Sequence, residues 1–333
     1  MRHRLKDVAE RAGVSVKTVS NVVNGYQHVR PDTRARVEAA IAELRYRPNL
    51  SARNLRKGRT GVIALAVPEL DIPYFAELAR HVVAAAVDHG WTVLIHPTGG
   101  GPEQERVAAA GIGDHMIDGL IFSPLSLDAE DLTGLDGMPM VLLGERVDHG
   151  LADHVVIDNV TAAREMTTHL IGLGRRRIAA IGSPRTPEGA GARLRLAGYT
   201  AALTEAGLGY DESLVVPTPA WHRADGAAAM RHLLDSGARP DAVFCFNDTL
   251  ALGALRALHE AGRRVPGDVA VAGFDDIEDG RFSVPTLTTV APDKERLARL
   301  AVDLLAGRLA GDRDAPPREL TAPHRLTPRE STA

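Results

Sequence analysis

The sequence lacks most of the features that mark secreted, membrane-bound or disulfide-stabilised proteins. Its 333 residues include a single cysteine, Cys245, which excludes an intramolecular disulfide and fits a reducing compartment. No apolar run approaches the roughly 20 residues that a membrane-spanning helix needs. The first four residues, Met1–Arg4, are followed by no apolar stretch of the signal-peptide type. We therefore expect a cytoplasmic protein that has no association with a membrane.

The usual patterns of a catalytic or metal site are also missing. The 13 histidines are scattered, with no paired spacing on one helix, and one cysteine cannot build a thiolate zinc site. No serine lies in a nucleophile-elbow pattern. The segment Gly189–Gly191 has a GxG spacing but lacks the strand, turn and helix of a dinucleotide site. We expect no catalytic residue, no metal and no cofactor.

Charge is distributed unevenly along the chain. Residues 1–59 hold 14 Lys+Arg and 5 Asp+Glu, whereas the rest of the chain holds 25 basic and 38 acidic residues. The net charge of −4 therefore conceals a basic N-terminal segment on an acidic body. A basic segment at one end indicates a polyanionic partner, and nucleic acid is the leading candidate.

Two short helical patterns joined by a turn open this basic segment. Apolar residues at helical spacing predict a first helix over Leu5–Arg11, and Gly13 suits a turn that requires positive φ. Ser15 is placed to cap a second helix, Val16–Asn24. The residues expected on the shared buried side are Val8, Ala9, Ala12, Val19, Val22 and Val23. Two helices joined by a three-residue turn with glycine predict a helix-turn-helix.

The second helix of such a motif carries the residues that read DNA. Its N-terminal end enters the major groove, so we expect Val16, Lys17, Ser20 and Asn21 to face outward. Lys17 is suited to guanine, Asn21 to a paired contact with adenine, and Val16 to a thymine methyl group. Thr18 is better placed to hold a phosphate, which sets register without reading sequence. The alternative is a small helical subdomain whose surface happens to be charged.

A third helix and a linker complete the basic segment. Pro31 suits the first turn of a helix, and the face expected to cover the first two helices comprises Val37, Ile41 and Leu44. The segment Tyr46–Asn49 is expected to stop this helix, because proline disfavours helix in the residue before it. Leu50–Lys57 follows, a polar and basic segment that is too short to be a stable helix by itself. It is therefore expected to order only when it binds a partner.

The run Leu5–Lys57 resembles the headpiece and hinge of the LacI/GalR family of bacterial transcription regulators, and the similarity continues through nearly the whole chain. The resemblance implies that the hinge segments of two subunits pair and fold on the operator, where a leucine enters the minor groove. Leu55 matches that leucine, and Ala52 lies on the same face one turn earlier. An apolar wedge between base steps kinks DNA. The alternative for Leu55 is an ordinary apolar residue of a linker.

From Thr60 onward, short β-type runs alternate with helical patterns. The expected strands are Gly61–Val67, Trp91–Ile95, Gly119–Phe122, Met140–Leu143, Arg177–Gly182, Ala242–Phe246 and Val269–Gly273. The expected helices include Phe75–Asp88, Glu103–His115, Thr161–Leu173, Ala251–Ala261 and Lys294–Leu309. Such alternation predicts βαβ units and parallel sheets covered on both faces. Because these strands exceed one compact unit, we expect two lobes.

The resemblance implies where the chain divides. It predicts a small all-α helix-turn-helix headpiece over 1–48, a hinge helix or linker over 49–59, and a two-lobed α/β domain of the periplasmic-binding-protein type over 60–333. Its chain would cross between the lobes near Asp158, Val290 and Glu319. The first lobe would hold 61–159 and 291–318, and the second would hold 160–290 and 319–330.

A small-molecule site is expected between the lobes, because ligands of such sheets bind at the carboxyl ends of the strands. The candidate residues, each of which matches a position that the family uses for effector contact, are Tyr74, Phe75, Arg195, Trp221, Asn247 and Asp275. Polar side chains among them suit hydroxyl groups, and aromatic faces suit the apolar side of a sugar or base. For the aromatic residues the alternative is core packing, and Asp248 is a candidate cap of the following helix. Glu145 is an additional, weaker candidate.

The sequence predicts a homodimeric, sequence-specific transcriptional regulator, with a repressor favoured. Its partners would be a palindromic double-stranded DNA operator and a small-molecule effector, for which a sugar is the first choice and a purine or nucleoside the second. Two alternatives belong to other classes. One is a solute-binding or sugar-processing protein with an accessory helical head, and the other is an architectural DNA binder whose body only dimerises.

Overall fold

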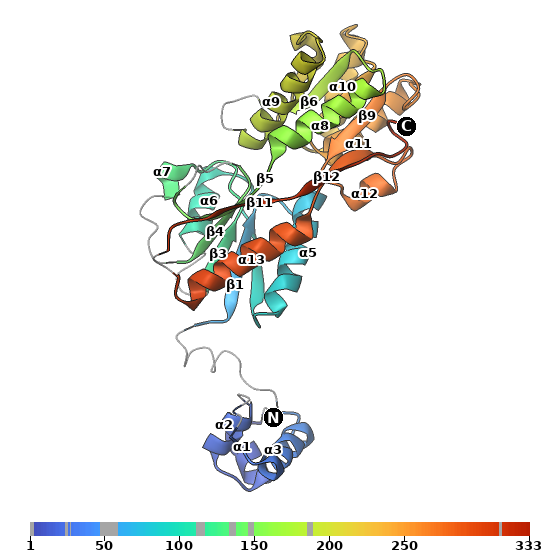
Figure 1. Cartoon of the computed structure of the whole chain (residues 1–333). Coiled ribbons are helices and arrows are strands. Elements are labelled where there is room, and N and C mark those ends of the chain that lie inside the picture. Colours follow the sequence, from blue (N-terminus) through green and yellow to red (C-terminus); the bar gives the residue numbers. More distant parts are fainter. Residues whose placement is uncertain are drawn as a thin grey trace. The chain divides into compact units, whose positions relative to one another are not determined.

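The computed structural model of the chain describes residues 3–23, 26, 28–46, 59–110, 117–132, 138–145, 150–184, 189–312 and 315–333. Two compact units make up the chain, Met1–Gly61 and Val62–Ala333. The first is helical, and the second contains two six-stranded sheets with helices between their strands (Figure 1). This arrangement confirms the fold class expected from the sequence. The expected hinge, with Ala52 and Leu55, lies outside the described residues.

The headpiece consists of helices α1 (Leu5–Ala12), α2 (Val16–Val23) and α3 (Pro31–Glu43). Gly13, at φ +63°, ends α1. The hydroxyl of Ser15 then accepts a hydrogen bond from the backbone N–H of Thr18 at 3.1 Å and so caps α2, as expected. The three helices meet in an apolar core whose fully buried members, one from each helix, are Val8, Val19 and Val37.

Helix α3 ends earlier than the prediction, which placed its stop at Tyr46–Asn49. The last helical residue is Glu43, and Arg45 adopts a left-handed conformation at φ +45°. The N–H of Tyr46 then donates to the carbonyl oxygen of Ile41 at 2.9 Å, and the Tyr46 ring is buried in the headpiece core. This hydrogen bond and the buried ring close the helix in the manner of a Schellman motif.

The first lobe is built on a parallel sheet. Its strand order is β11-β5-β4-β3-β1-β2, and every pair of neighbours is parallel. The strands are β1 (Val62–Val67), β2 (Thr92–Pro97), β3 (Gly119–Phe122), β4 (Met140–Leu143), β5 (Asp153–Ile157) and β11 (Glu319–Ala322). Three of them, β1, β3 and β4, are almost fully buried apolar runs, as is typical of a sheet covered on both faces.

Helices cover both faces of this sheet. Helices α5 (Pro73–Val87) and α13 (Lys294–Ala310) lie side by side over one face, and α6 (Pro102–Ala109) and α7 (Ala129–Leu132) contribute to the apolar cluster on the other (Figure 1). Helix α13 comes late in the chain but is fixed to this lobe by a buried ion pair. The Nε atom of Arg308 donates to a carboxylate oxygen of Asp153 in β5 at 2.8 Å.

The second lobe repeats the architecture. Its sheet has the order β12-β10-β9-β8-β6-β7, and all neighbours are parallel except β12 with β10. The strands are β6 (Ile178–Ser183), β7 (Val215–Pro217), β8 (Ala242–Cys245), β9 (Ala270–Phe274), β10 (Thr288–Pro292) and β12 (His324–Thr327). A 3₁₀ turn, η1 (Glu212–Leu214), leads into β7.

Two pairs of helices sandwich this second sheet. One face is covered by α8 (Asn159–Gly172) and α9 (Ala190–Glu205), and the other by α10 (Arg223–Asp235) and α11 (Asp248–Glu260). The short helix α12 (Glu278–Arg281) follows β9. In each of these two pairs, the helices approach closely at a glycine, Gly198 in α9 and Gly253 in α11. A Cβ atom on Gly198 would lie 2.2 Å from the carbonyl oxygen of Val160.

The pairing of the strands corrects two of the expected lobe boundaries. Glu319–Ala322 was expected in the second lobe, but as β11 it pairs with β5 of the first, so the chain crosses at Pro323. Similarly, the last two residues of β10 belong to the second sheet, so the preceding crossing follows Pro292 rather than Val290. Asp158 lies between β5 and α8. Among the described residues, no helix is both long and apolar enough to span a bilayer.

Candidate functional site

The headpiece presents the N-terminal part of α2 to solvent. Val16 is 46% exposed, and Lys17 beside it is also exposed. Thr18, Ser20 and Asn21 are half-buried, so these side chains are less exposed than expected for residues that face outward. The expected reading residues therefore share one helix end, which has Val16 and Lys17 at its most accessible point.

In the second unit, the expected ligand residues Asn247 and Asp275 follow the carboxyl ends of β8 and β9, whereas Arg195 lies within a helix. Arg195, in α9, is only 7% exposed, although it is an arginine. Its Nε atom donates to the side-chain oxygen of Asn159 at 2.7 Å, and its Nη1 atom donates to the carbonyl oxygen of Phe246. The guanidinium lies 3.6 Å from the centre of the Phe274 ring and 5.2 Å from that of Trp221. These contacts hold the charge of Arg195 in one orientation.

Side chains of both lobes meet around Arg195. The amide of Asn159 donates to the carboxylate of Glu145 at 2.6 Å, and Glu145 follows β4 in the first lobe. On the other side, Nη2 of Arg195 lies 4.0 Å from a carboxylate oxygen of Asp275, which follows β9 in the second lobe. We call Tyr74, Glu145, Asn159, Arg195 and Asp275 the polar junction.

Asp275, which contacts Arg195, has a strongly raised pKa. It is 7% exposed, and burial raises its pKa from 3.8 to about 6, although the charges of Arg195 and Lys294 oppose the shift. Its backbone has φ +115°, and its N–H donates to the carbonyl oxygen of Val290 at 2.8 Å. A positive φ is uncommon for any residue other than glycine, and the hydrogen bond to Val290 helps to hold the turn after β9 in this conformation.

Tyr74 completes the polar junction from the first lobe. Burial raises the pKa of its hydroxyl, and the charges of Asp275 and Glu145 act in the same direction. The hydroxyl therefore stays protonated and is able to donate a hydrogen bond. The ring makes an edge contact with Phe75, with centres 5.3 Å apart. Phe75 itself packs partly buried against the first-lobe core.

Asn247 has a structural role that the sequence-based assignment did not foresee. Its side-chain oxygen accepts the backbone N–H of Leu250 at 2.8 Å and so caps α11, and its amide donates to the carbonyl oxygen of Trp221 at 3.0 Å. Asp248, the candidate cap, instead accepts a hydrogen bond from the Thr289 hydroxyl at 2.7 Å and is fully buried. Asn247 thus supports Trp221 rather than lying free in the junction.

Two charged residues missed by the sequence reasoning join the lobes beside the polar junction. The Nζ atom of Lys294 donates to the carboxylate of Glu77 in α5, and to the carbonyl oxygen of Asp275 at 2.7 Å. Glu77 also accepts the backbone N–H of Glu278 at 2.9 Å. One signal was available in the sequence. Lys294 is the first residue of α13, where a positive charge is unfavourable to the helix dipole unless it is used elsewhere.

Comparison with known proteins identifies the two units separately. The model described as bacterial regulatory proteins, lacI family, matches residues 4–49, which contain the three headpiece helices. The model described as periplasmic binding protein-like domain matches residues 167–332. These matches agree with the helix-turn-helix and with the paired α/β lobes.

Relatives and solved structures match the chain along nearly its whole length. The HTH-type transcriptional regulator CelR of Thermobifida fusca is 39% identical over 339 residues, which cover 99% of this chain and 98% of CelR. The structure of a CelR–cellobiose complex is 35% identical, with a TM-score of 0.74 over 99% of this chain and 100% of that one. The lac repressor dimer bound to operator is 31% identical, with a TM-score of 0.84 over 100% of this chain and 99% of that one.

A helix-turn-helix head, a two-lobed body with a polar junction and a relative 39% identical over 99% of the chain lead to one assignment. The chain belongs to the lacI family of bacterial regulatory proteins, and it is a DNA-binding transcriptional regulator.

Proposed function

We propose that the protein is a homodimeric repressor that binds a palindromic operator and responds to a sugar bound between its lobes. The observation that carries the sugar assignment is the polar junction, because it places a fixed guanidinium, two carboxyl groups and a phenol at one point between two lobes. Since its operator lies on the chromosome, such a repressor acts in the cytoplasm.

The operator is read by α2. Val16, Lys17, Ser20 and Asn21 contact base edges in the major groove, and Thr18 contacts a phosphate. Leu55 of the hinge enters the minor groove at the centre of the site, and Ala52 contacts DNA from the same face of the hinge. A flexible pyrimidine–purine step at the centre lowers the cost of a kink. A two-fold dimer requires two half-sites of opposite orientation, so the operator is a palindrome.

Exposed apolar side chains on both lobes suit a dimer surface. In the first lobe, Val87 of α5 is 66% exposed, and the edge strand β2 exposes Leu94 at 41%. In the second lobe, Phe282 is 78% exposed and Val284 is 95% exposed. Large apolar residues gathered on a surface mark contact sites. The similarity to the lac repressor dimer supports a dimer of this chain.

The chemistry of the polar junction suits a sugar. The carboxylates of Glu145 and Asp275 accept hydrogen bonds from hydroxyl groups, and Arg195 donates to ring or hydroxyl oxygens. The rings of Tyr74 and Trp221 suit the apolar face of a pyranose. Because a regulator of similar structure has been solved with cellobiose, β-linked glucosides are the first effectors to test. A purine or nucleoside is the second candidate, which the edge-packed Tyr74 and Phe75 rings favour.

Binding couples to DNA through the angle between the lobes. Tyr74 and Glu145 belong to the first lobe, whereas Arg195 and Asp275 belong to the second, so a ligand held by both sets favours one lobe arrangement. Reciprocity then requires the operator to change the sugar affinity by the factor by which the sugar changes operator affinity. That factor is typically about 5–150-fold.

Thermal unfolding with a panel of sugars and nucleosides tests the effector assignment. Cellobiose should raise the melting temperature of the intact protein, and Arg195→Met should abolish this rise while it leaves operator binding without sugar unchanged. A rise with nucleosides alone would transfer the assignment to the purine class. No rise with any compound would support the architectural alternative, in which the body only dimerises.

A further inference from the structure

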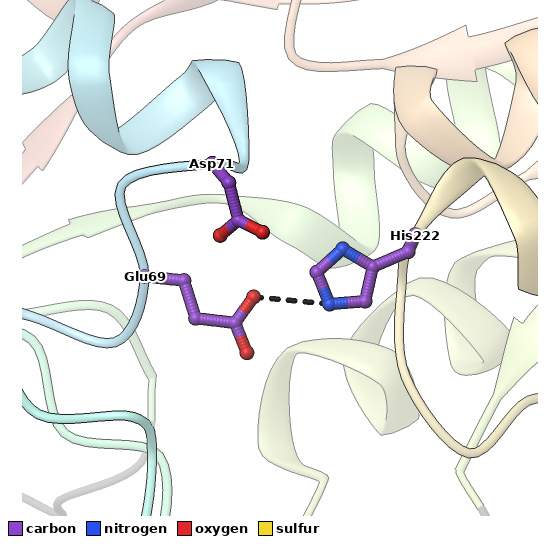
Figure 2. A group of neighbouring side chains, drawn as sticks. All are labelled: Glu69, Asp71 and His222. Atoms are coloured by element: carbon purple, nitrogen blue, oxygen red, sulfur yellow. Dashed lines mark ion pairs between the residues drawn. The ribbon is translucent and has the colours of Figure 1, made fainter.

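A second group of charged side chains lies between the lobes, and it shares no residue with the polar junction. Glu69 and Asp71 come from the loop between β1 and α5 in the first lobe. His222 comes from the second lobe, immediately before α10. Figure 2 shows the two carboxylates and the imidazole turned toward one another. We call these three residues the loop triad.

The atoms of the loop triad are close enough to share one ion. The Oε2 atom of Glu69 lies 3.0 Å from Nε2 of His222, and one ligand atom from each of the three residues lies within 4.8 Å of the others. Oε2 of Glu69 is also shielded from solvent, and although Nε2 of His222 lies 3.0 Å away, this contact does not have the geometry of a hydrogen bond, nor does any other within the described part of the chain. A buried carboxylate oxygen is costly unless a donor or a cation satisfies it.

The donor set has the composition of a transition-metal site. Zinc is bound by histidine nitrogen and carboxylate oxygen at about 2.0–2.2 Å, and two ligands of a tetrahedral ion at these distances are roughly 3.4 Å apart. The observed separation of 3.0 Å between Glu69 and His222 therefore needs only a small adjustment. A divalent ion would also relieve the repulsion between the carboxylates of Glu69 and Asp71, which are two residues apart.

We propose that Glu69, Asp71 and His222 bind one divalent transition-metal ion of the zinc class and so form a bridge between the two lobes. Three protein ligands leave one tetrahedral position for water. The mixed nitrogen and oxygen set favours zinc, nickel or cobalt over magnesium, which prefers oxygen ligands alone and loses its water reluctantly.

A bridge of this kind would act on the arrangement of the lobes. Two ligands lie on one lobe and the third on the other, so the complete site exists only while the lobes keep their present spacing. An ion that binds one arrangement and not another stabilises the arrangement it binds. The effect on operator affinity rests on the proposed function, but the existence of the site does not.

Zinc titration of the full-length protein, purified with a chelator, tests the proposal without DNA or sugar. The affinity is measured by competition with a chromophoric chelator, and cobalt substitution supplies an absorption signature of the coordinated ion. One zinc ion should bind per chain. His222→Gln and Glu69→Gln should each weaken binding at least about 100-fold, since even outer-shell changes cost 10–100-fold. Magnesium should not compete.

A matched control is provided by another histidine–carboxylate pair. Nε2 of His324 lies 3.1 Å from Oε2 of Glu165, but no third ligand joins this pair within the described residues. His324→Gln should therefore leave zinc affinity unchanged. Thermal unfolding of the zinc-free variants establishes that each is folded.

Three results would overturn the proposal. The first is no stoichiometric binding of zinc. The second is equal loss of affinity in His222→Gln and in the control, which would indicate adventitious binding to surface histidines. The third is a stability loss in His222→Gln that is the same with and without zinc, which would show that His222 and Glu69 form only an ion pair. None of these results would affect the sugar-response experiment, which is carried out without added metal.

Discussion

Individual residues in the polar junction behave differently from what their types suggest. Arg195 is buried, and its guanidinium lies against the Phe274 ring. Asp275 is an acid whose ionisation is opposed by its surroundings. A sugar supplies hydroxyl groups, which would form hydrogen bonds with both buried side chains.

The raised pKa of Asp275 predicts a specific pH dependence of stability. Because the folded pKa is about 6 and the unfolded value is near 3.8, the folded protein holds a proton between these values that the unfolded chain has released. This contribution to stability is present below about pH 4 and is lost as the pH rises toward 6. It amounts to about 3 kcal/mol at roughly 1.4 kcal/mol per unit.

Denaturant unfolding of the wild type and of Asp275→Asn at several pH values measures this effect. The free energy of unfolding of the wild type, minus that of the variant, should fall between pH 4 and pH 7. A difference that is constant across this range would show that Asp275 titrates as an ordinary surface acid, and one that grows with pH would show that folding lowers its pKa.

Residue type alone could not assign the roles of neighbouring residues. Asn247 and Asp248 are both good helix caps, and the sequence named Asp248 as a candidate cap and Asn247 as a candidate ligand residue. The structure reverses the capping role, because Asn247 reaches the N–H of Leu250 while Asp248 turns toward Thr289. The difference depends on contacts with residues far away in the chain.

At the scale of helices and strands, the sequence correctly predicted strands where an apolar run has clear boundaries. The expected strands over 119–122 and 140–143 match β3 and β4. Strands β5, β7, β10, β11 and β12 were missed, because each has at most five residues and all but β7 mix polar with apolar residues. The lobe to which β11 belongs is set by its pairing with β5, and such long-range pairing leaves no local pattern in the sequence.

Glycines determine how closely the helices of the second lobe approach. A Cβ atom on Gly253 of α11 would lie 2.0 Å from the carbonyl oxygen of Arg223 and 2.7 Å from the backbone nitrogen of Ala227. These are backbone atoms, so no side-chain rotation relieves the clash. Gly253 is thus required for the contact between α10 and α11.

Gly253→Ala should therefore destabilise the second lobe by at least about 3 kcal/mol, the upper end of the cost of overpacking. Gly172 is the control, because it lies exposed at the end of α8 with nothing within 4 Å of an added Cβ. Gly172→Ala should leave stability unchanged or raise it by up to about 1 kcal/mol. Thermal unfolding of both variants checks the pair, and equal stability of the two would contradict the close-packing account.

At the scale of the whole molecule, the sequence predicted a basic DNA-binding headpiece joined to an acidic two-lobed body. Charge composition and the spacing of apolar residues are sufficient for this prediction, because both are read from short stretches of the sequence. The polar junction was only partly predicted, since Asn159, Glu77 and Lys294 reach it from elements that the fold alone brings together. Residues 47–58 join the headpiece to the body and lie outside the described residues, and their role as a hinge is a prediction from family resemblance.

The proposed dimer surface makes a prediction at this scale. Phe282→Glu with Val284→Asp places two charges on the most exposed apolar side chains of the second lobe. The double variant should sediment as a monomer at concentrations where the wild type is a dimer, because buried unpaired charges oppose association. Glu205→Arg, at the exposed end of α9, is the control variant, because it changes the surface charge away from the proposed interface. A dimer that persists in the double variant would place the interface elsewhere.

Operator binding tests the central claim most directly. The full-length protein is titrated onto a palindromic duplex from its own upstream region and onto a scrambled duplex of equal length, by fluorescence anisotropy at several salt concentrations. We predict that the palindrome binds at least about 10³-fold more tightly. Affinity should fall steeply with salt, and the effector should change it by about 5–150-fold. Equal affinity for palindromic and scrambled DNA at every salt concentration would contradict the account.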